Sequence, residues 1–356
     1  MGKKVLVYLL SGIVLVGLSM WPHAAHSQEL RTVRTAIIAP SMSFVPLYVA
    51  SDQGFFKEGK ISSEIVVIRS SASQIQALVA GSVDFSFQSP APLMRAVEKG
   101  ADLVLLAGIV NVPFYDLIGG KNYKSIEELR GTTLAISGIA DAVTVLLQDM
   151  LSAHGLTYPR DYTLLQAGGS TDRWATIQKG AVSAGLLEPP LSFMAKDQGF
   201  STLGQLRDYV PEMQFTSVSA NRSWAHKNAT LVDDYLTSLL KAIRYIYENK
   251  SGTVTIIQKD FKYKPEYAER VYDYYVRNKV IPPDGAMTLK GVGAVLSVLE
   301  KMGDFKEKVR PGVEKYLDSS FLTRAQARLS RRIQIQVQAV ERKPRAARKG
   351  KQRQIK

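Results

Sequence analysis

Two polar residues end strand-like segments at matching points of the chain, and their chemistry suggests a binding site. The apolar run before Pro90 stops at Gln88 and Ser89, and a similar run 99 positions later stops at Glu188, before Pro189. A hydroxyl or a primary amide can donate and accept hydrogen bonds, whereas an ionised carboxylate only accepts them. We therefore expect Ser89 and Glu188 to contact a polar ligand, without holding the fold together.

Other small or polar residues follow strand-like segments in the same way. The remaining candidate ligand contacts are Ser41, Ser43, Gln88, Ser137, Gly138 and Asp141. Helices are expected to begin near Ser43, Ser71, Ser137 and Ser170, and helix N-termini favour an acidic group on the ligand. The acids Glu188 and Asp141 would repel a bare inorganic anion, so a ligand with both an acceptor group and an N–H donor fits better. The alternative for Asp141 is that it only caps the following helix.

The segments that carry these residues alternate between strand and helix patterns. Strands are expected over residues 33–39, 64–68, 83–87, 103–110, 133–137 and 163–166, and helices over 44–56, 92–99, 231–247, 265–279, 288–302 and 313–317. Strands separated by helices predict an α/β fold with mostly parallel sheets and helices on both faces. The tyrosines between residues 267 and 278 are expected to pack in a core, because aromatic residues at helical spacing usually do. The alternative is that one of them contributes a ring to the cleft.

The pattern of strand, helix, strand, helix, strand, proline and helix occurs twice. Gly81, Val83, Pro90 and Gly100 reappear as Gly180, Val182, Pro189 and Gly199. Two such units predict two similar lobes; chance similarity among α/β units is the alternative, because only two copies exist. Ligands of open parallel sheets lie beyond the carboxyl ends of the strands. The lobes should therefore form two walls of one cleft, with Ser89 and Glu188 on opposite walls.

We expect five regions along the chain. They are a signal peptide at 1–27, the first segment of lobe 1 at 28–118, lobe 2 at 119–212, a return to lobe 1 with C-terminal helices at 213–330, and a disordered basic tail at 331–356. Lys3 and Lys4, the apolar run over residues 5–20 and the small residues before position 28 match a secretory signal peptide. An uncleaved anchor is the alternative, although the run is short for a span of about 20 residues.

The net charge of +14 is concentrated in the tail. Residues 331–356 hold ten basic residues and one acid, and the two leader lysines add two more charges, which leaves +3 for residues 28–330. The tail lacks aromatic residues and apolar periodicity, so nucleic acid is not an expected partner, and contact with anionic membrane or wall polymer is favoured. The chain has no cysteine, which excludes disulfides and lipid attachment through cysteine.

The run AIIAPSMSFVPLYVASDQGFFKEG, together with ALVAGSVDFSFQSP and GLLEPPLSFMAKDQGF, resembles the periplasmic substrate-binding proteins of nitrate-, sulfonate- and taurine-type ABC importers. Their relatives include binders of thiamine-precursor pyrimidines. The likeness covers roughly residues 32–302 and implies a two-lobed type II periplasmic binding fold that closes by a hinge. It also implies a monomer that passes a small-molecule ligand (a sulfonate, amino-sulfonate, carboxylate or heteroaromatic) to ABC permease and ATPase subunits.

The resemblance also implies which residues line the site. They are Ser41, Gln88, Ser89, the Ser137-Gly138 helix start and Glu188. Because a Glu-Pro pair is common at the position of Glu188 in this family, a structural contribution of the acid is the alternative. The family pattern gives no support for the basic tail.

Two alternative functions are an enzyme and a sensor. Some relatives of this fold make pyrimidine precursors with histidine chemistry and a pyridoxal phosphate lysine. Here only His154 and His226 follow the leader, no cluster has metal-ligand spacing, and no nucleophile elbow or phosphate loop occurs. We therefore predict no catalytic residues, no cofactor and no metal site. A sensory binding protein that reports ligand to a receptor remains the second alternative.

Overall fold

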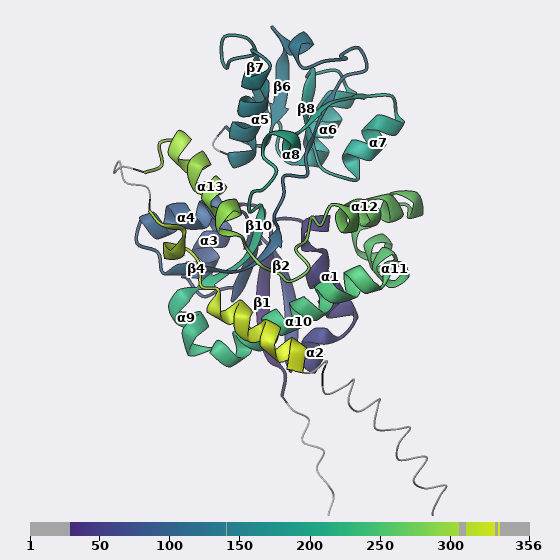
Figure 1. Ribbon diagram of the computed structural model, residues 1–356. Helices are drawn as coiled ribbons and strands as arrows, with labels where there is room; N and C mark the ends of the chain where they lie inside the picture. The colour runs from purple at the N-terminus through teal and green to yellow at the C-terminus, as the bar shows by residue number, and fades with distance from the viewer. Residues whose placement is uncertain (1–28, 140, 306–310, 332–333, 335–356) are drawn as a thin grey trace, which may run out of the picture.

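The computed structural model describes residues 29–139, 141–305, 311–331 and 334. It forms two lobes joined by two crossing segments (Figure 1). The expected signal peptide at 1–27 lies outside the described residues, as does the basic tail apart from residues 331 and 334. Within the described part of the chain, no helix is long and apolar enough to cross a membrane.

Lobe 1 is built on a five-stranded sheet in the order β2-β1-β3-β10-β4. Its strands are β1 (Arg31–Ile37), β2 (Ile61–Val67), β3 (Phe85–Gln88), β4 (Leu103–Val110) and β10 (Thr216–Asn221). Strand β1 pairs in parallel with β2 and β3, and β10 is antiparallel to both of its neighbours. The alternation of β4 places Val104 and Leu106 in one apolar cluster and Leu103 and Leu105 in another, so both faces of this sheet are covered.

Lobe 2 repeats this design in a sheet with the order β7-β6-β8-β5-β9. Its strands are β5 (Asp116–Gly119), β6 (Thr133–Ile136), β7 (Thr163–Gln166), β8 (Ala184–Leu187) and β9 (Ser201–Gln205). Strand β6 pairs in parallel with β7 and β8, while β5 is antiparallel to β8 and β9. Each lobe therefore combines four strands that run in the same direction with one antiparallel strand that enters from the other lobe.

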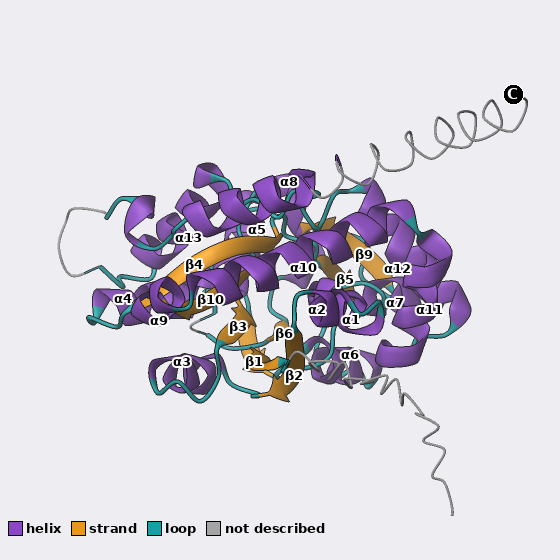
Figure 2. Cartoon of the chain, turned by 90° about the horizontal axis from the view of Figure 1, so that it is seen from below, coloured by secondary structure: helices purple, strands orange, loops and turns teal. Residues whose placement is uncertain are grey.

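Helices cover both sheets (Figures 1 and 2). Those of the first segment are η1 (Met42–Phe44), α1 (Val45–Asp52), α2 (Phe55–Glu58), α3 (Ser71–Val79) and α4 (Pro90–Glu98). Lobe 2 holds η2 (Glu127–Leu129), α5 (Ala142–Ala153), α6 (Ser170–Gln178), α7 (Leu191–Asp197) and α8 (Leu206–Tyr209). The return segment holds α9 (Arg222–Lys227), α10 (Ala229–Glu248), α11 (Lys250–Phe261), α12 (Pro265–Arg277), α13 (Leu289–Lys301), η3 (Val313–Lys315) and a last helix over residues 320–331.

The strand registers repeat between the lobes, as the duplicated sequence predicted. In lobe 1, Ala36 pairs with Val66 on one side and with Ser86 on the other. In lobe 2, the residues 98 positions later do the same, since Leu134 pairs with Leu164 and Ala184. Matching registers across three strands are not expected from chance similarity among α/β units. The two lobes are therefore copies of one unit in structure as well as in sequence pattern.

The topology also determines which edge of each sheet faces the other lobe. Strand β4 ends at Val110 and leads directly across to lobe 2, and β1, β2 and β3 run in the same direction as β4. Strand β5 enters lobe 2 at Asp116, and β6, β7 and β8 run in the opposite direction to it. The carboxyl ends of the parallel strands of both lobes therefore face the boundary between the lobes.

The structure corrects several details of the sequence analysis. The boundary expected at residue 118 falls inside β5, which pairs along its whole length with β8. Strand β10 was not expected. Its segment lies between helices in the sequence, although it completes the sheet of lobe 1. The segment 313–317 forms only the short η3, after which Leu317 pairs with Leu105. Arg331 belongs to the last helix, so a disordered tail cannot begin there.

Candidate ligand-binding site

Glu188 lies at the boundary between the lobes, directly after β8. Its main-chain oxygen accepts a hydrogen bond from the N–H of Ser192 at 3.2 Å. The side chain keeps partial contact with solvent, but protein atoms enclose its carboxyl group, and this enclosure raises the pKa to about 7. The positive charge of Arg173 acts in the opposite direction. The carboxyl group therefore changes its protonation state near neutral pH, whereas an ordinary glutamate does so at about pH 4.

Three tyrosines from different segments lie within electrostatic reach of Glu188. Tyr115 belongs to the first crossing segment, Tyr263 lies between α11 and α12, and Tyr275 is on α12. Burial raises the pKa of each phenol, and the negative charge of Glu188 raises it further. The phenols therefore stay protonated at neutral pH and can act as hydrogen-bond donors. Lobe 2, the crossing segment and lobe 1 each contribute to this group.

Arg173 is a buried cation on the lobe 2 side of the boundary, with only 3% of its surface exposed. Its Nε donates to the main-chain oxygen of Leu186 at 2.7 Å, and its Nη1 donates to that of Gly168 at 2.7 Å. Its Nη2 donates to Ser170 Oγ at 2.9 Å. The guanidinium also lies over the ring of Tyr115, 5.9 Å from the ring centre. These contacts hold the positive charge in one place, next to Tyr115 and within reach of Glu188.

The lobe 1 side presents buried polar atoms that have no partner among the described residues. The side chain of Gln88 is 5% exposed, and neither atom of its amide makes a hydrogen bond there. The buried hydroxyl of Tyr275 is in the same situation. A buried polar group without a partner costs about 1–3 kcal/mol. In a binding site this cost is offset when a ligand supplies the missing hydrogen bonds.

The residues expected from the sequence to bind ligand all follow the parallel strands at the interlobe edge. They are Ser41 and Ser43 after β1, Gln88 at the end of β3 and Ser89 after it, Ser137, Gly138 and Asp141 after β6, and Glu188 after β8. Ser43 is buried, and Ser89 is partly buried at the start of α4, where its side chain makes no capping bond. Direct contact of these residues with a ligand stays a prediction.

Two statements about the β6 edge need revision. The helix expected to start at Ser137-Gly138 begins at Ala142, and Ser137 and Gly138 lie in the preceding loop. Asp141 occupies the N-cap position of α5, but its side chain makes no capping hydrogen bond. Instead, its charge helps to raise the pKa of Tyr115. The geometry therefore does not favour the interpretation that Asp141 only caps the helix.

Sequence reasoning missed Tyr115, Arg173 and Tyr263. Arg173 carried no usable signal, because an arginine in an amphipathic helix is expected on the solvent side. The tyrosines of α12 were expected to pack in a core. Tyr272 and Tyr275 do so, since they are 5% and 2% exposed, but Tyr275 also faces the charge of Glu188. The core interpretation was therefore correct for Tyr272 and Tyr275, whereas Tyr267 and Tyr274 are only partly buried.

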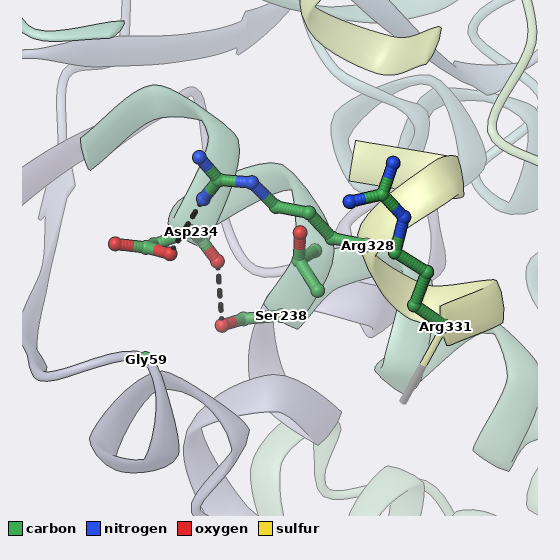
Figure 3. Close-up of a pocket in the computed structure, with 6 residues that line it drawn as sticks. Gly59, Asp234, Ser238, Arg328 and Arg331 are labelled. Carbon is green, nitrogen blue, oxygen red and sulfur yellow. Dashed lines mark hydrogen bonds and ion pairs between the residues drawn. The ribbon is translucent and has the colours of Figure 1, made fainter. Parts of the chain in front are cut away.

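Two cavities lie away from this group. One of about 270 Å³ is lined by Gly59, Asp234, Thr237, Ser238, Arg328 and Arg331 (Figure 3). There Arg328 pairs with Asp234 at 2.9 Å and Ser238 Oγ donates to main-chain oxygens, so the polar groups mainly attach the last helix to α10. The second, of about 250 Å³, is lined by Leu78, Val79, Ala80, Gly81, Val83, Asp84, Asn221 and Trp224. Neither cavity gathers groups from both lobes.

Among the described residues, the two histidines and the acidic residues form no comparable site elsewhere. His154 bonds Glu127 at 2.6 Å and Tyr209 at 2.5 Å on the surface of lobe 2, and His226 lies 3.2 Å from Asp318. In the part of the chain that the structure describes, no three His, Cys, Asp or Glu residues are grouped as metal ligands. The interlobe group around Glu188 is therefore the best-supported candidate site.

The protein has a periplasmic binding protein fold. This fold is defined by two α/β lobes with matching registers, two crossing segments and polar groups between the lobes. The nitrate-binding protein NrtA from Synechocystis PCC 6803 superposes with a TM-score of 0.69 and 16% identity, over 85% of this chain and 89% of NrtA. The alkanesulfonate-binding protein SsuA from Xanthomonas axonopodis pv. citri, bound to MOPS, superposes with a TM-score of 0.65 and 16% identity, over 82% and 99% of the two chains. The two-lobed fold expected from the sequence is confirmed.

The family follows from the sequence comparison. Residues 41–252 match the family model described as NMT1/THI5 like, and the chain belongs to this family. YtlA of Bacillus subtilis (strain 168), named for an inferred binding role, is 20% identical over 303 residues, which cover 82% of this chain and 90% of YtlA. The 4-amino-5-hydroxymethyl-2-methylpyrimidine phosphate synthase THI5 of Saccharomyces cerevisiae (strain ATCC 204508 / S288c) is 21% identical over 150 residues, 41% of this chain and 43% of that enzyme.

Proposed function

We propose that this protein is the solute-binding component of an ABC importer, which captures a small polar organic ligand between its lobes and delivers it to a membrane permease. The observation that carries the proposal is the convergence of Glu188, Tyr115, Tyr263 and Tyr275 at the boundary of two lobes, together with the buried amide of Gln88 at the interlobe end of β3, which has no partner among the described residues. The family and the fold support it, and so does the leader expected at residues 1–27, which would direct the protein to the periplasm.

The charges at the site limit the chemistry of the ligand. An ionised Glu188 about 4 Å from a bare inorganic anion would repel it by about 4 kcal/mol at an effective dielectric constant of 20, so with its pKa of about 7 the carboxyl group would take up a proton when such an anion binds. Arg173 nevertheless supplies a fixed positive charge beside Tyr115. A ligand that accepts hydrogen bonds at one end and donates an N–H to Glu188 at the other satisfies both charges. Among the ligand classes considered, amino-sulfonates and amino-substituted heteroaromatics meet this condition.

A screen by thermal shift at pH 7.5 would test the ligand class with matched compounds. The panel should include nitrate, an alkanesulfonate, the corresponding amino-alkanesulfonate, a carboxylate and an aminopyrimidine. We expect the compounds with an N–H donor to raise the melting temperature most. Stabilisation by nitrate or the alkanesulfonate alone would show that Glu188 does not select the ligand.

Calorimetry on two variants would then locate the site. Glu188→Gln keeps the shape and removes the charge, so it should weaken binding of an N–H donor by about 1.5–3 kcal/mol. Ser89→Ala removes a neutral hydrogen bond and should weaken ligand binding by about 0.5–1.5 kcal/mol. Glu300→Gln, an exposed change on α13, is the control. Unchanged affinity in both site variants would place the binding site elsewhere.

The enzyme and sensor alternatives predict different results. If the protein were an enzyme, it would convert its ligand, and mass spectrometry after incubation with the tightest binder would show a product. The histidines His154 and His226 do not belong to the group around Glu188. A sensor would bind ligand without supporting uptake. Loss of ligand uptake in cells that lack the gene, restored by the wild-type protein, would support the transport function.

A further inference from the structure

The boundary between the lobes is apolar on one side, while the other side combines polar contacts with the packing of Phe193 of α7 against the apolar cluster of lobe 1. On the α13 side, one continuous apolar cluster joins Leu296 of α13, Leu93 of lobe 1 and Leu147 of α5 in lobe 2. On the opposite side, α12 of lobe 1 lies beside α7 of lobe 2, as both views show (Figures 1 and 2). Separation of the apolar side would expose buried surface, whereas polar contacts can be exchanged for water. The lobes should therefore pivot near α13 and open between α7 and α12.

On this side an acid of α7 accepts two hydrogen bonds from α12, in addition to the bonds that Arg207 of α8 donates to Tyr274 and Asn278. Arg270 Nη1 lies 2.5 Å from Asp197 Oδ2, and the Tyr267 hydroxyl donates to the same oxygen at 3.1 Å. The guanidinium of Arg270 also lies over two rings, 5.0 Å from the centre of Phe193 on α7 and 5.5 Å from that of Tyr267 on α12. These hydrogen bonds lower the pKa of Asp197, which is therefore ionised at neutral pH. The contact crosses from one lobe to the other.

The two helices that meet here also carry or adjoin residues of the candidate site. Helix α7 begins three residues after Glu188, and α12 carries Tyr275. We propose that Asp197 and Arg270 form a latch, an ion pair that holds the lobes closed and positions Tyr275 opposite Glu188. The latch deepens the proposed function and rests on it, because closure serves a purpose only if the interlobe site binds a ligand. Asp197 and Arg270 are positioning residues that act through the helices.

The latch is weak enough to open. The side chains of Arg270 and Asp197 are 42% and 41% exposed. Ion pairs at this exposure contribute little free energy to the closed state, and the hydroxyl and ring contacts add to that contribution. Loss of the pair should therefore lower the ratio of closed to open protein about two- to tenfold. Because a ligand that requires the closed state binds in proportion to its population, the affinity should fall by no more than the same factor.

Distances between two labels measure closure without any ligand. The chain has no cysteine, so Thr255→Cys on α11 and Lys179→Cys after α6 provide two exposed labelling positions, one on each lobe. Double electron–electron resonance at low salt would give the distribution of closed and open distances. In Asp197→Asn we expect the open population to rise about two- to tenfold. Wild-type protein in 1 M NaCl should shift the same way, since salt screens exposed pairs.

A matched pair of charges within one lobe provides the control. Lys250 and Asp273 join α11 to α12 at 2.7 Å, with 47% and 42% exposure. Asp273→Asn should leave the label distances unchanged. The exchanged variant Asp197→Arg with Arg270→Asp should restore closure, which a merely structural role of either residue would not do. Arg270→Gln repeats the test from the other helix, and urea unfolding shows whether each variant is folded.

Two outcomes would overturn the latch. One is a distance distribution that is the same in wild type, Asp197→Asn and Arg270→Gln when all three are folded. The other is an equal shift in Asp273→Asn. Neither outcome depends on a ligand, so the latch can fail while the interlobe site still binds. Conversely, a confirmed latch with no ligand bound at Glu188 would refute the proposed function and leave the ion pair as a conformational lock.

Discussion

Replacement of Glu188 by Gln should stabilise the ligand-free protein, and the effect should grow with pH. In the folded protein the pKa of the carboxyl group is raised from 4.5 to about 7, chiefly because it is enclosed by protein. Between these values the folded protein keeps a proton that the unfolded chain releases, so the free energy of unfolding falls as the pH rises. Below pH 4.5 the carboxyl group is protonated in both the folded and the unfolded protein, so it causes no loss of stability there. Above about pH 7 both are ionised and the loss is complete.

The size of the effect follows from the pKa difference. About 2.5 pKa units correspond to about 3 kcal/mol, and partial exposure of the side chain makes this an upper limit. Gln has nearly the same shape and no charge, so it should not lose stability over this range. The advantage of Glu188→Gln over wild type should therefore grow by about 1–3 kcal/mol between pH 5 and pH 8. This result would replace the expectation from sequence that Glu188 has no effect on the fold.

Urea unfolding at pH 5, 6, 7 and 8, followed by tryptophan fluorescence, would measure the difference. The exposed Glu300→Gln serves as the control and should follow wild type at every pH. If the free energies of unfolding of wild type and Glu188→Gln change in parallel across this range, the carboxyl group is not enclosed as described. The argument for a charged, selective site at Glu188 would then lose its physical basis.

Two further predictions concern the fold around the site. Tyr275→Phe should raise the free energy of unfolding without ligand by up to about 1 kcal/mol, because the buried hydroxyl has no partner among the described residues; a loss of stability in urea would show that it is paired. Truncation after Ser330 should leave the melting temperature unchanged. Truncation after Ser319 should lower the free energy of unfolding by at least about 3 kcal/mol, because it removes the buried Phe321 and the arginines that pair with Asp233. Equal melting curves for the two truncated proteins would refute this prediction.

The sequence predicted the frame of this protein because the relevant signals are local. Strands β4 and β7 have the bounds expected from their apolar runs, and the repeated glycines and prolines identified the two units. The same signals located the strand ends, and with them Gln88 and Glu188. Strand β10 was missed because its partners β3 and β4 lie more than 100 residues earlier. A short strand that is buried on both faces has no periodicity to distinguish it from the helices around it.

The chemistry of the site was less predictable because its members meet only in three dimensions. Tyr115 and Tyr275 are 160 positions apart in sequence and both respond to the charge of Glu188. Nothing in the local pattern distinguishes these tyrosines from others that pack in the core. Arg173 is buried in a helix whose composition predicts exposure, and only its three hydrogen-bond acceptors explain its position. The meeting of the two tyrosines with Glu188 depends on the packing of the two lobes, and the contacts of Arg173 depend on the packing of α6 within lobe 2.

The two lobes use different side chains at one matching position, where a helix is connected to the sheet. Gln74 of α3 lies 99 positions before Arg173 of α6, and it is also buried. Its amide donates to the main-chain oxygen of Ile68 at 2.9 Å and accepts from Ser86 at 2.7 Å, so a neutral side chain ties helix to sheet in lobe 1. Arg173 connects helix to sheet in lobe 2 with a charged side chain. The free energy needed to bury a charge is larger than that needed to bury an amide. Because lobe 1 makes the equivalent connection with a neutral residue, the proposed function offers a reason for the charge of Arg173, which lies within reach of Glu188.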